Sequence, residues 1–225
     1  VVSFSLKKKA NIFLKSIKKE KNKFVINVKI YRDEKFFYIK NINKNNLYNI
    51  LASIGVIFSI GFIKNLKPFL FYKFLTPIGR GDISKIKINN KIFYLIDESY
   101  NSNPMSMKSA ISNFDLVKVK KNKKHFLMGD MLELGKFSKK LHINLSKHIN
   151  SSSIDKFHVY GRFVKETYKK IKKIKRGNIF SEQHQINDLI VKELNNNDYL
   201  MIKGSNSTGL NKFVQKLKKN NLYAL

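Results

Sequence analysis

The hydrophobic pattern changes character within the first third of the chain. Apolar and polar residues partly alternate over residues 24–30, and residues 35–39 form a second run rich in aromatic side chains. These patterns predict two short strands joined by charged turns. Residues 46–63 are mostly apolar and predict a buried helix. Pro68 opens a shorter segment, residues 69–75, which we also predict to be helical.

The pattern breaks at residues 76–81, where one proline and two glycines occur within six positions. Proline and glycine interrupt helices and strands, so we predict a domain boundary or hinge here. Beyond it, short apolar runs alternate with amphipathic segments. The predicted strands are residues 91–96, 125–128, 157–160, 178–180 and 199–203, and the predicted helices are residues 105–117, 138–149, 163–171, 185–194 and 210–218. This alternation is typical of βαβ units and predicts an α/β fold with a mostly parallel sheet.

Three polar loops follow predicted strands, at residues 97–104, 129–135 and 203–207. In parallel sheets, the loops at the carboxyl ends of the strands gather at one edge, together with the N-termini of helices. We therefore expect the functional site at this edge.

Composition changes this picture little. The net charge is +30, which suggests a nucleic-acid partner, but only four of the 45 basic residues are Arg, and the lysines are spread along the whole chain. This spread favours compositional drift over a dedicated nucleic-acid groove, although a basic nucleic-acid or anion-binding module remains the alternative. The absence of cysteine excludes disulfides, cysteine-ligated metals and thiol nucleophiles.

The longest apolar stretch, residues 47–63, barely reaches the length of about 17 residues that a membrane span needs. It also contains polar positions, among them Asn49 and Ser53, and small residues that suit close packing. We predict a buried helix and no membrane span.

Residues 97–104 read D-E-S-Y-N-S-N-P, so that one loop carries two carboxylates, a phenol and two amides. Such groups can bind the hydroxyls of a sugar or the polar groups of a nucleotide or peptide. The same residues also suit a turn that caps the following helix, and residue types alone leave both interpretations open.

Residues 129–135, G-D-M-L-E-L-G, also follow an apolar strand. Their acids suit either a metal or a helix cap, and we favour the cap. His142, on the next predicted helix, is expected to be a packed side chain. Lys203-Gly204-Ser205 suits an anion site or an ordinary turn. The sequence has no phosphate-binding loop of the form G-x-x-x-x-G-K-[ST], so the phosphates of ATP would need groups outside this chain.

Taken in order, these segments resemble the Mur ligase family, in the branch that adds D-alanyl-D-alanine during peptidoglycan synthesis. Residues 97–104 are similar to its D-[DE]-[SA]-Y-N-A-N-P loop, and residues 129–135 with Ser138 and His142 to its G-D-M-x-E-L-G block. Lys203-Gly204-Ser205 matches its K-G-S turn, and Gly79-Arg80 the G-R that opens its third domain. Asn45 to Asn49 resemble a further segment, in which Asn45 replaces a histidine; Asn206 and Asn211 replace an arginine and a glutamate.

The resemblance implies the C-terminal half of a cytoplasmic, three-domain ligase that is monomeric when intact and needs no nucleic acid. Residues 1–76 would be the remnant of a central ATPase α/β domain, and residues 77–225 a Rossmann-like C-terminal domain. In such enzymes, ATP phosphorylates the carboxylate of a UDP-N-acetylmuramoyl-tripeptide, and the amine of D-alanyl-D-alanine attacks the acyl phosphate with Mg²⁺ assisting. Because the phosphate loop and the metal ligands would lie outside this chain, we expect the chain alone to be inactive.

The resemblance also implies individual roles, residue by residue. Arg80 would meet the phosphates of ATP as the catalytic cation, Asp97 or Glu98 would hold the ribose, and Asn49 would contact the adenine. The implied substrate-binding residues are Tyr100, Asn101, Asn103, Lys203 and Ser205.

Overall fold

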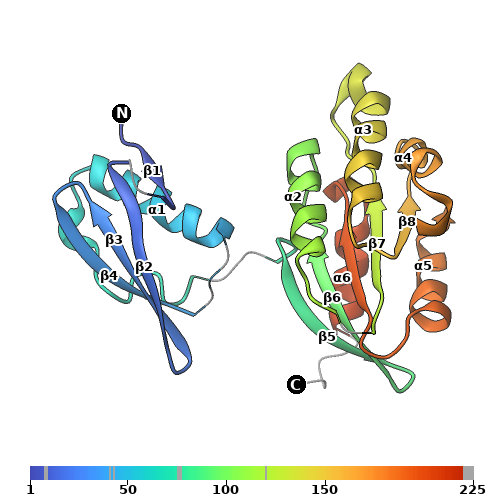
Figure 1. Ribbon diagram of the computed structural model, residues 1–225, viewed down its shortest axis with the longest axis horizontal. Helices are drawn as coiled ribbons and strands as arrows, with labels where there is room; N and C mark the ends of the chain where they lie inside the picture. The colour runs from blue at the N-terminus through green and yellow to red at the C-terminus, as the bar shows by residue number, and fades with distance from the viewer. Residues whose placement is uncertain (8–9, 41, 43, 75–77, 120, 220–225) are drawn as a thin grey trace. The chain divides into compact units, whose positions relative to one another are not determined.

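The computed structural model describes the chain except residues 8–9, 41, 43, 75–77, 120 and 220–225. The chain forms two compact units, Val1–Thr76 and Pro77–Leu225 (Figure 1). The boundary predicted between residues 76 and 77 lies outside the described residues, and each unit is described by itself.

The first unit is a four-stranded sheet covered by one long helix. The strands, in the order β1 (Phe4–Ser5), β2 (Ile12–Glu20), β3 (Lys23–Ile30) and β4 (Asp33–Ile39), are antiparallel except for the parallel β1–β2 pair. Alternate residues of β3 are buried and pack against helix α1 (Lys44–Ser59). The predicted strands at residues 24–30 and 35–39 are therefore confirmed.

Helix α1 confirms a packed helix, but it ends four residues before the predicted position at residue 63. Gly61 adopts a left-handed φ of 80°, the Gly61 N–H donates to Phe58 O, and the Phe62 N–H donates to Ile57 O. This pair of bonds is the Schellman motif, which ends a helix at a glycine. In the described part of the chain, no helix is both long and apolar enough to cross a membrane.

The helix predicted over residues 69–75 is wrong for the described part of that segment. Residues 67–74 form consecutive turns, in which the amides of Leu70, Tyr72 and Phe74 donate to the carbonyl groups three positions earlier. Aromatic packing explains the difference: Phe69 stacks on Tyr38 at 4.5 Å between ring centroids, and Phe71 packs against Phe37. Phe37 and Tyr38 are successive residues of β4, so their rings lie on opposite faces of the sheet. A segment in which Phe69 packs on one ring and Phe71 on the other cannot remain helical.

The second unit is a six-stranded sheet with helices on both faces. Its strands lie in the order β5-β6-β10-β7-β8-β9, and only β5 (Asp82–Ile88) is antiparallel to its neighbour β6 (Lys91–Glu98). The other strands are β7 (Lys124–Gly129), β8 (Lys156–Tyr160), β9 (Arg176–Phe180) and β10 (Tyr199–Lys203). The predicted α/β class with a mostly parallel sheet is confirmed; strand β6 continues through Asp97 and Glu98, which were predicted to be loop.

Helices α2 (Pro104–Asp115), α3 (Ser138–Ser151) and α4 (Val164–Lys170) bury their apolar residues on one face of this sheet. Helix α5 (Ile186–Asp188), which continues as a π-helical turn over Leu189–Glu193, and helix α6 (Leu210–Lys219) cover the other face. A 3-10 helix, Gln183–Gln185, precedes α5, so the helix predicted over residues 185–194 combines three helical geometries. The carboxyl ends of β6, β10 and β7 lie side by side, which brings their loops together.

Candidate functional site

Ser205 connects the three polar loops at the carboxyl edge of the second sheet. Its backbone N–H donates to Asp130 O at 2.9 Å, and its hydroxyl accepts from the Leu132 N–H at 2.9 Å. The same hydroxyl donates to Ser102 O at 3.3 Å. The predicted convergence of residues 97–104, 129–135 and 203–207 is confirmed by these contacts.

The buried side chain of Lys203 binds the backbone of the loop that follows β6. Its side chain is 2% exposed, and its ammonium donates to Asn101 O at 2.9 Å and lies 3.4 Å from Glu98 Oε2. Burial lowers the pKa of Lys203 and raises the pKa of Glu98, against their mutual attraction. The structure places Lys203 against the loop backbone, and its contact with a substrate stays a prediction.

The two carboxylates predicted to bind ribose differ in environment. Asp97 is fully buried: its Oδ1 accepts from the Ser99 N–H and hydroxyl, and its Oδ2 accepts from Lys218 Nζ at 2.7 Å and Gln215 Nε2 at 3.3 Å. The Glu98 carboxylate is 20% exposed. Of the two, Glu98 is the one that a ligand outside the protein can reach without displacing a bonded partner.

Arg80 and Tyr100 form an exposed stack next to Glu98. The guanidinium carbon of Arg80 lies 4.6 Å from the centroid of the Tyr100 ring. The Tyr100 N–H donates to Gly79 O at 3.1 Å, and a Cβ atom at Gly79 would come within 2.9 Å of Tyr100. With its φ of 80°, Gly79 is a position that requires glycine, and it brings Arg80 against the loop after β6.

The two amides of the loop, Asn101 and Asn103, both accept backbone hydrogen bonds. Asn103 caps α2, because its Oδ1 accepts from the Ser106 N–H at 2.8 Å, so the capping interpretation is confirmed at this position. Asn101 Oδ1 accepts from the Ser102 N–H at 2.7 Å. Both Asn side chains remain exposed. Asn49 lies on α1 in the first unit, where its side chain is also exposed, and its contact with adenine stays a prediction.

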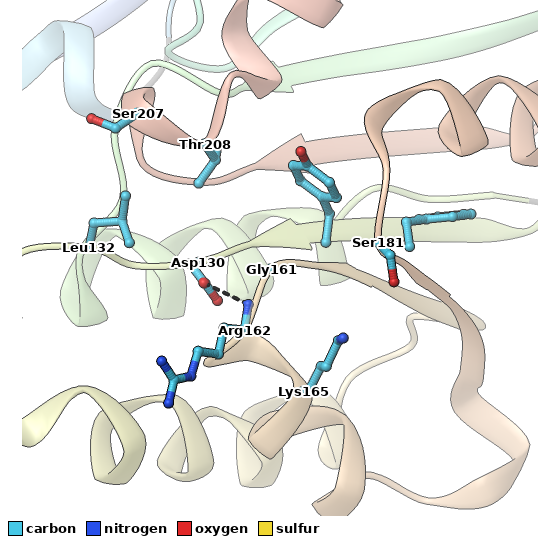
Figure 2. Close-up of a pocket in the computed structure, with 10 residues that line it drawn as sticks. Asp130, Leu132, Gly161, Arg162, Lys165, Ser181, Ser207 and Thr208 are labelled. Carbon is cyan, nitrogen blue, oxygen red and sulfur yellow. Dashed lines mark hydrogen bonds between the residues drawn. The ribbon is translucent and has the colours of Figure 1, made fainter.

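A pocket of about 480 Å³ opens beside these loops (Figure 2). Figure 2 shows Arg162 and Lys165 on one side of it and Leu132, Ser207 and Thr208 on the other. The residues that line it are Asp130, Leu132, Tyr160, Gly161, Arg162, Lys165, Phe180, Ser181, Ser207 and Thr208. Arg162 and Lys165 were not predicted from the sequence as site residues, although Gly161, between a predicted strand and a predicted helix, was a signal for a further functional loop.

Asp130 shapes one wall of this pocket. Its Oδ2 accepts from the Arg162 N–H at 2.9 Å, and its Oδ1 accepts from the Val164 N–H at 2.7 Å. A Cβ atom at Gly161, whose φ is 135°, would lie 2.6 Å from the Asp130 carboxyl carbon. The acid therefore caps a helix, as favoured from the sequence, but the helix is α4.

His142 is buried and fully bonded, as expected. Its Nε2 lies 3.0 Å from the Met131 N–H donor, and its Nδ1 lies 2.7 Å from Ser138 O. These partners require the neutral ring with the proton on Nδ1, and burial lowers the pKa of His142 accordingly. Among the described residues, no group of three or more His, Cys, Asp or Glu side chains could hold a metal ion.

Comparisons with known proteins identify the family and the fold to which the chain is similar. The family model described as "Mur ligase, glutamate ligase domain" matches residues 84–206. The UDP-N-acetylmuramoyl-tripeptide–D-alanyl-D-alanine ligase of Buchnera aphidicola from Acyrthosiphon pisum is 32% identical over 94% of this chain and 48% of the relative. The Bacillus subtilis protein of the same name is 26% identical over 82% of this chain and 40% of its own length.

Among solved structures, the MurF ligase of Thermotoga maritima in complex with ADP superposes with a TM-score of 0.71 at 20% identity, covering 97% of this chain and 49% of that one. At this identity, the likeness shows the fold. The chain spans about half the length of the curated relatives named above.

Proposed function

Because the chain belongs to the Mur ligase family, we propose that it supplies the C-terminal half of an ATP-dependent ligase. The proposed reaction joins D-alanyl-D-alanine to a UDP-N-acetylmuramoyl-tripeptide in peptidoglycan precursor synthesis. The curated relatives carry this name. The observation that carries the proposal is the pocket beside the three converging loops, which combines two cationic side chains with hydroxyl groups and an apolar wall.

The nucleotide side of the site is formed by the stack of Arg80 on Tyr100 and by Glu98. An exposed guanidinium can form charge-assisted hydrogen bonds with phosphate oxygens, and an accessible carboxylate can accept from both ribose hydroxyls. We assign Asp97 to holding the loop, because all its partners lie within the protein. The ADP named for the solved Thermotoga maritima structure supports a nucleotide here, and we propose that Asn49 contacts its adenine.

The dipeptide side is formed by the pocket of Figure 2. A volume of about 480 Å³ is within the usual range for small-molecule sites. Arg162 and Lys165 offer cations for the free carboxylate of D-alanyl-D-alanine, and Leu132 offers an apolar surface for a methyl group. A carboxylate anchored there leaves the amine of the dipeptide toward the loop edge, where Ser205 joins residues 97–104 to residues 129–135.

In the proposed reaction, a carboxylate oxygen of the tripeptide attacks the γ-phosphorus of ATP, and ADP leaves. The amine of the dipeptide then attacks the carbonyl carbon of the acyl phosphate; the new amide forms, the C–O bond to phosphate breaks, and an amine proton is released. The contribution of this chain is positioning and charge neutralisation. Tyr100, Asn101 and Asn103 line the substrate cleft, while Lys203 and Ser205 hold the loops that present it.

We expect the reaction to require Mg²⁺. The described residues offer no cluster that fits a metal ion, so its ligands are assigned outside this chain and no step is derived through it. The family also supports our proposals that residues 1–76 complete a central ATPase domain and that the intact enzyme works as a cytoplasmic monomer. These assignments leave the chain without a complete phosphate site, so we expect no ligation by the chain alone.

Calorimetric titration tests both halves of the proposal. The wild-type chain should bind D-alanyl-D-alanine, and Arg162→Ala should weaken that affinity at least tenfold, as about 1.4 kcal/mol from a lost charge-assisted bond predicts. Lys170→Ala, which removes an exposed cation from the far end of the following helix α4, should have no effect. Arg80→Ala should weaken ATP binding and leave dipeptide binding unchanged. Equal dipeptide affinity in Arg162→Ala and Lys170→Ala would contradict the assigned pocket.

A further inference from the structure

Lys218, near the end of α6, contacts the carboxylates of both Asp82 and Asp97. Among the residues that the structure describes, it is the one charged side chain that forms an ion pair with both. Its ammonium donates to Asp82 Oδ2 and to Asp97 Oδ2, the latter at 2.7 Å. The side chain is 18% exposed. Asp82 belongs to β5 and Asp97 to β6, so one cation on a helix joins both strands of the antiparallel pair.

One arm of this contact leads to Arg80. The other carboxylate oxygen of Asp82, Oδ1, accepts from the Gly79 N–H at 2.9 Å. Gly79 directly precedes Arg80, and the next amide, Gly81 N–H, donates to Asp97 O at 2.7 Å. The backbone on both sides of Arg80 is therefore bonded to Asp82 and Asp97, the two residues whose carboxylates Lys218 contacts.

The second arm leads to Tyr100. Asp97 Oδ1 accepts from the Ser99 N–H at 3.1 Å and from the Ser99 hydroxyl at 2.5 Å. Ser99 directly precedes Tyr100, whose N–H donates to Gly79 O at 3.1 Å. The bond from the Tyr100 N–H to Gly79 O joins the two chains of contacts. Both chains begin at the Lys218 ammonium, so the backbone segments that carry Arg80 and Tyr100 are linked to the same cation.

The electrostatics of this position support the same role. Burial by itself lowers the pKa of Lys218, but the hydrogen bonds and charges of Asp82 and Asp97 outweigh it and raise the pKa above its ordinary value. The ammonium therefore stays charged over the working range of pH. A fully buried carboxylate such as Asp97 needs such a partner, because an unpaired buried charge is strongly destabilising.

We propose that Lys218 is a positioning residue for nucleotide binding: through Asp82 and Asp97 it fixes the backbone at Gly79 and Ser99 and so holds Arg80 and Tyr100 in the geometry that meets ATP. This inference rests on the proposed function, because it takes the Arg80–Tyr100 stack as part of the nucleotide site. The effect of Lys218 on the mobility of the two loops can be measured without any nucleotide.

Amide hydrogen exchange and ATP titration on the whole chain test the proposal together. Lys218→Met should speed exchange at Gly79, Ser99 and Tyr100 about tenfold, the effect of losing one charge-assisted hydrogen bond, and should weaken ATP binding by a similar factor. Lys218→Arg, which restores a cation, should recover most of both. Lys212→Met removes an exposed lysine from the same helix and should change neither.

Asp82→Ala separates the arms and is informative even where Lys218→Met fails to fold. It should speed exchange at Gly79 and weaken ATP binding, while Ser99 keeps its protection through Asp97. Unchanged exchange at Gly79 in Asp82→Ala, or no recovery in Lys218→Arg, would overturn the positioning role. Wild-type protein that binds no ATP would instead refute the nucleotide site, and the exchange data would still decide whether Lys218 orders the loops.

Discussion

The Asp130 carboxylate is the clearest place to test how the wall of the pocket in Figure 2 is stabilised. Both of its oxygens accept backbone N–H groups from the loop after β8, at 2.9 Å from Arg162 and 2.7 Å from Val164. Asp130→Asn keeps the shape of the side chain but replaces one acceptor with an NH₂ donor. One backbone N–H then loses its partner, and the other loses a charged acceptor.

The expected cost follows from these two bonds. A partly buried N–H without an acceptor costs about 1–3 kcal/mol, and the change from a charged to a neutral acceptor adds about 1 kcal/mol. We therefore expect Asp130→Asn to destabilise the second unit by about 2–4 kcal/mol. Glu133→Gln is the matched control: it removes the same charge from an exposed side chain of the same loop, and should change stability by less than about 0.5 kcal/mol.

The assay must report on the second unit alone, because a chain with two compact units need not unfold in one step. Native-state hydrogen exchange at the amides of β7 measures the opening of the second unit directly. A loss in Asp130→Asn no larger than that in Glu133→Gln would refute the reasoning, since the two bonds would then contribute nothing beyond charge.

Three further predictions concern the second unit. Gly161→Ala should lower stability by about 2–4 kcal/mol in thermal unfolding, because the new Cβ would lie 2.6 Å from the Asp130 carboxyl carbon and φ is 135°. Ser102→Ala should raise it by about 1 kcal/mol in the same assay, because the buried Ser102 hydroxyl has no donor or acceptor for its oxygen among the described residues. Burial lowers the pKa of His158 from 6.5 to about 3. Because the folded value is the lower one, His158 stabilises the fold above pH 6.5 and this contribution is lost as the pH falls toward 3; urea unfolding at pH 7 and pH 5 should differ by about 2 kcal/mol more in wild type than in His158→Gln.

The parallel strands could be predicted from the sequence because each one appears as a short apolar run followed by a polar loop. Residues 199–202 form an apolar run between Asp198 and Lys203, and β10 covers the predicted residues 199–203 in the structure. A strand buried on both faces gives such a run, and the polar loop behind it indicates the carboxyl edge. The convergence of the three loops was predicted because the carboxyl ends of parallel strands meet at one edge of a sheet. The strand order itself was not predicted and comes from the structure.

Strands that bury few side chains, and networks of side-chain contacts, could not be predicted in this way. Strand β5 buries only Ile86 deeply, and β2 is lysine-rich and largely exposed, so neither has a clear periodic signal. Phe69 leaves helical geometry because of its partner on β4, far away in sequence.

The same limit applies to the site. Lys218 is one of 45 basic residues, and nothing in its neighbours along the chain indicates two carboxylates from another part of the fold. The proposed role of Arg162 and Lys165 likewise depends on the fold, because these residues line a pocket only together with Thr208, which is distant in sequence.

The central claim is that the pocket of Figure 2 receives D-alanyl-D-alanine. The most direct measurement is the backbone amide NMR spectrum of the labelled chain during titration with this dipeptide and, separately, with L-alanyl-L-alanine. The D isomer should shift the amides of Gly161, Arg162 and Thr208 in a saturable way, with the L isomer markedly weaker. No localised shift, or equal shifts from both isomers, would contradict the proposed substrate site.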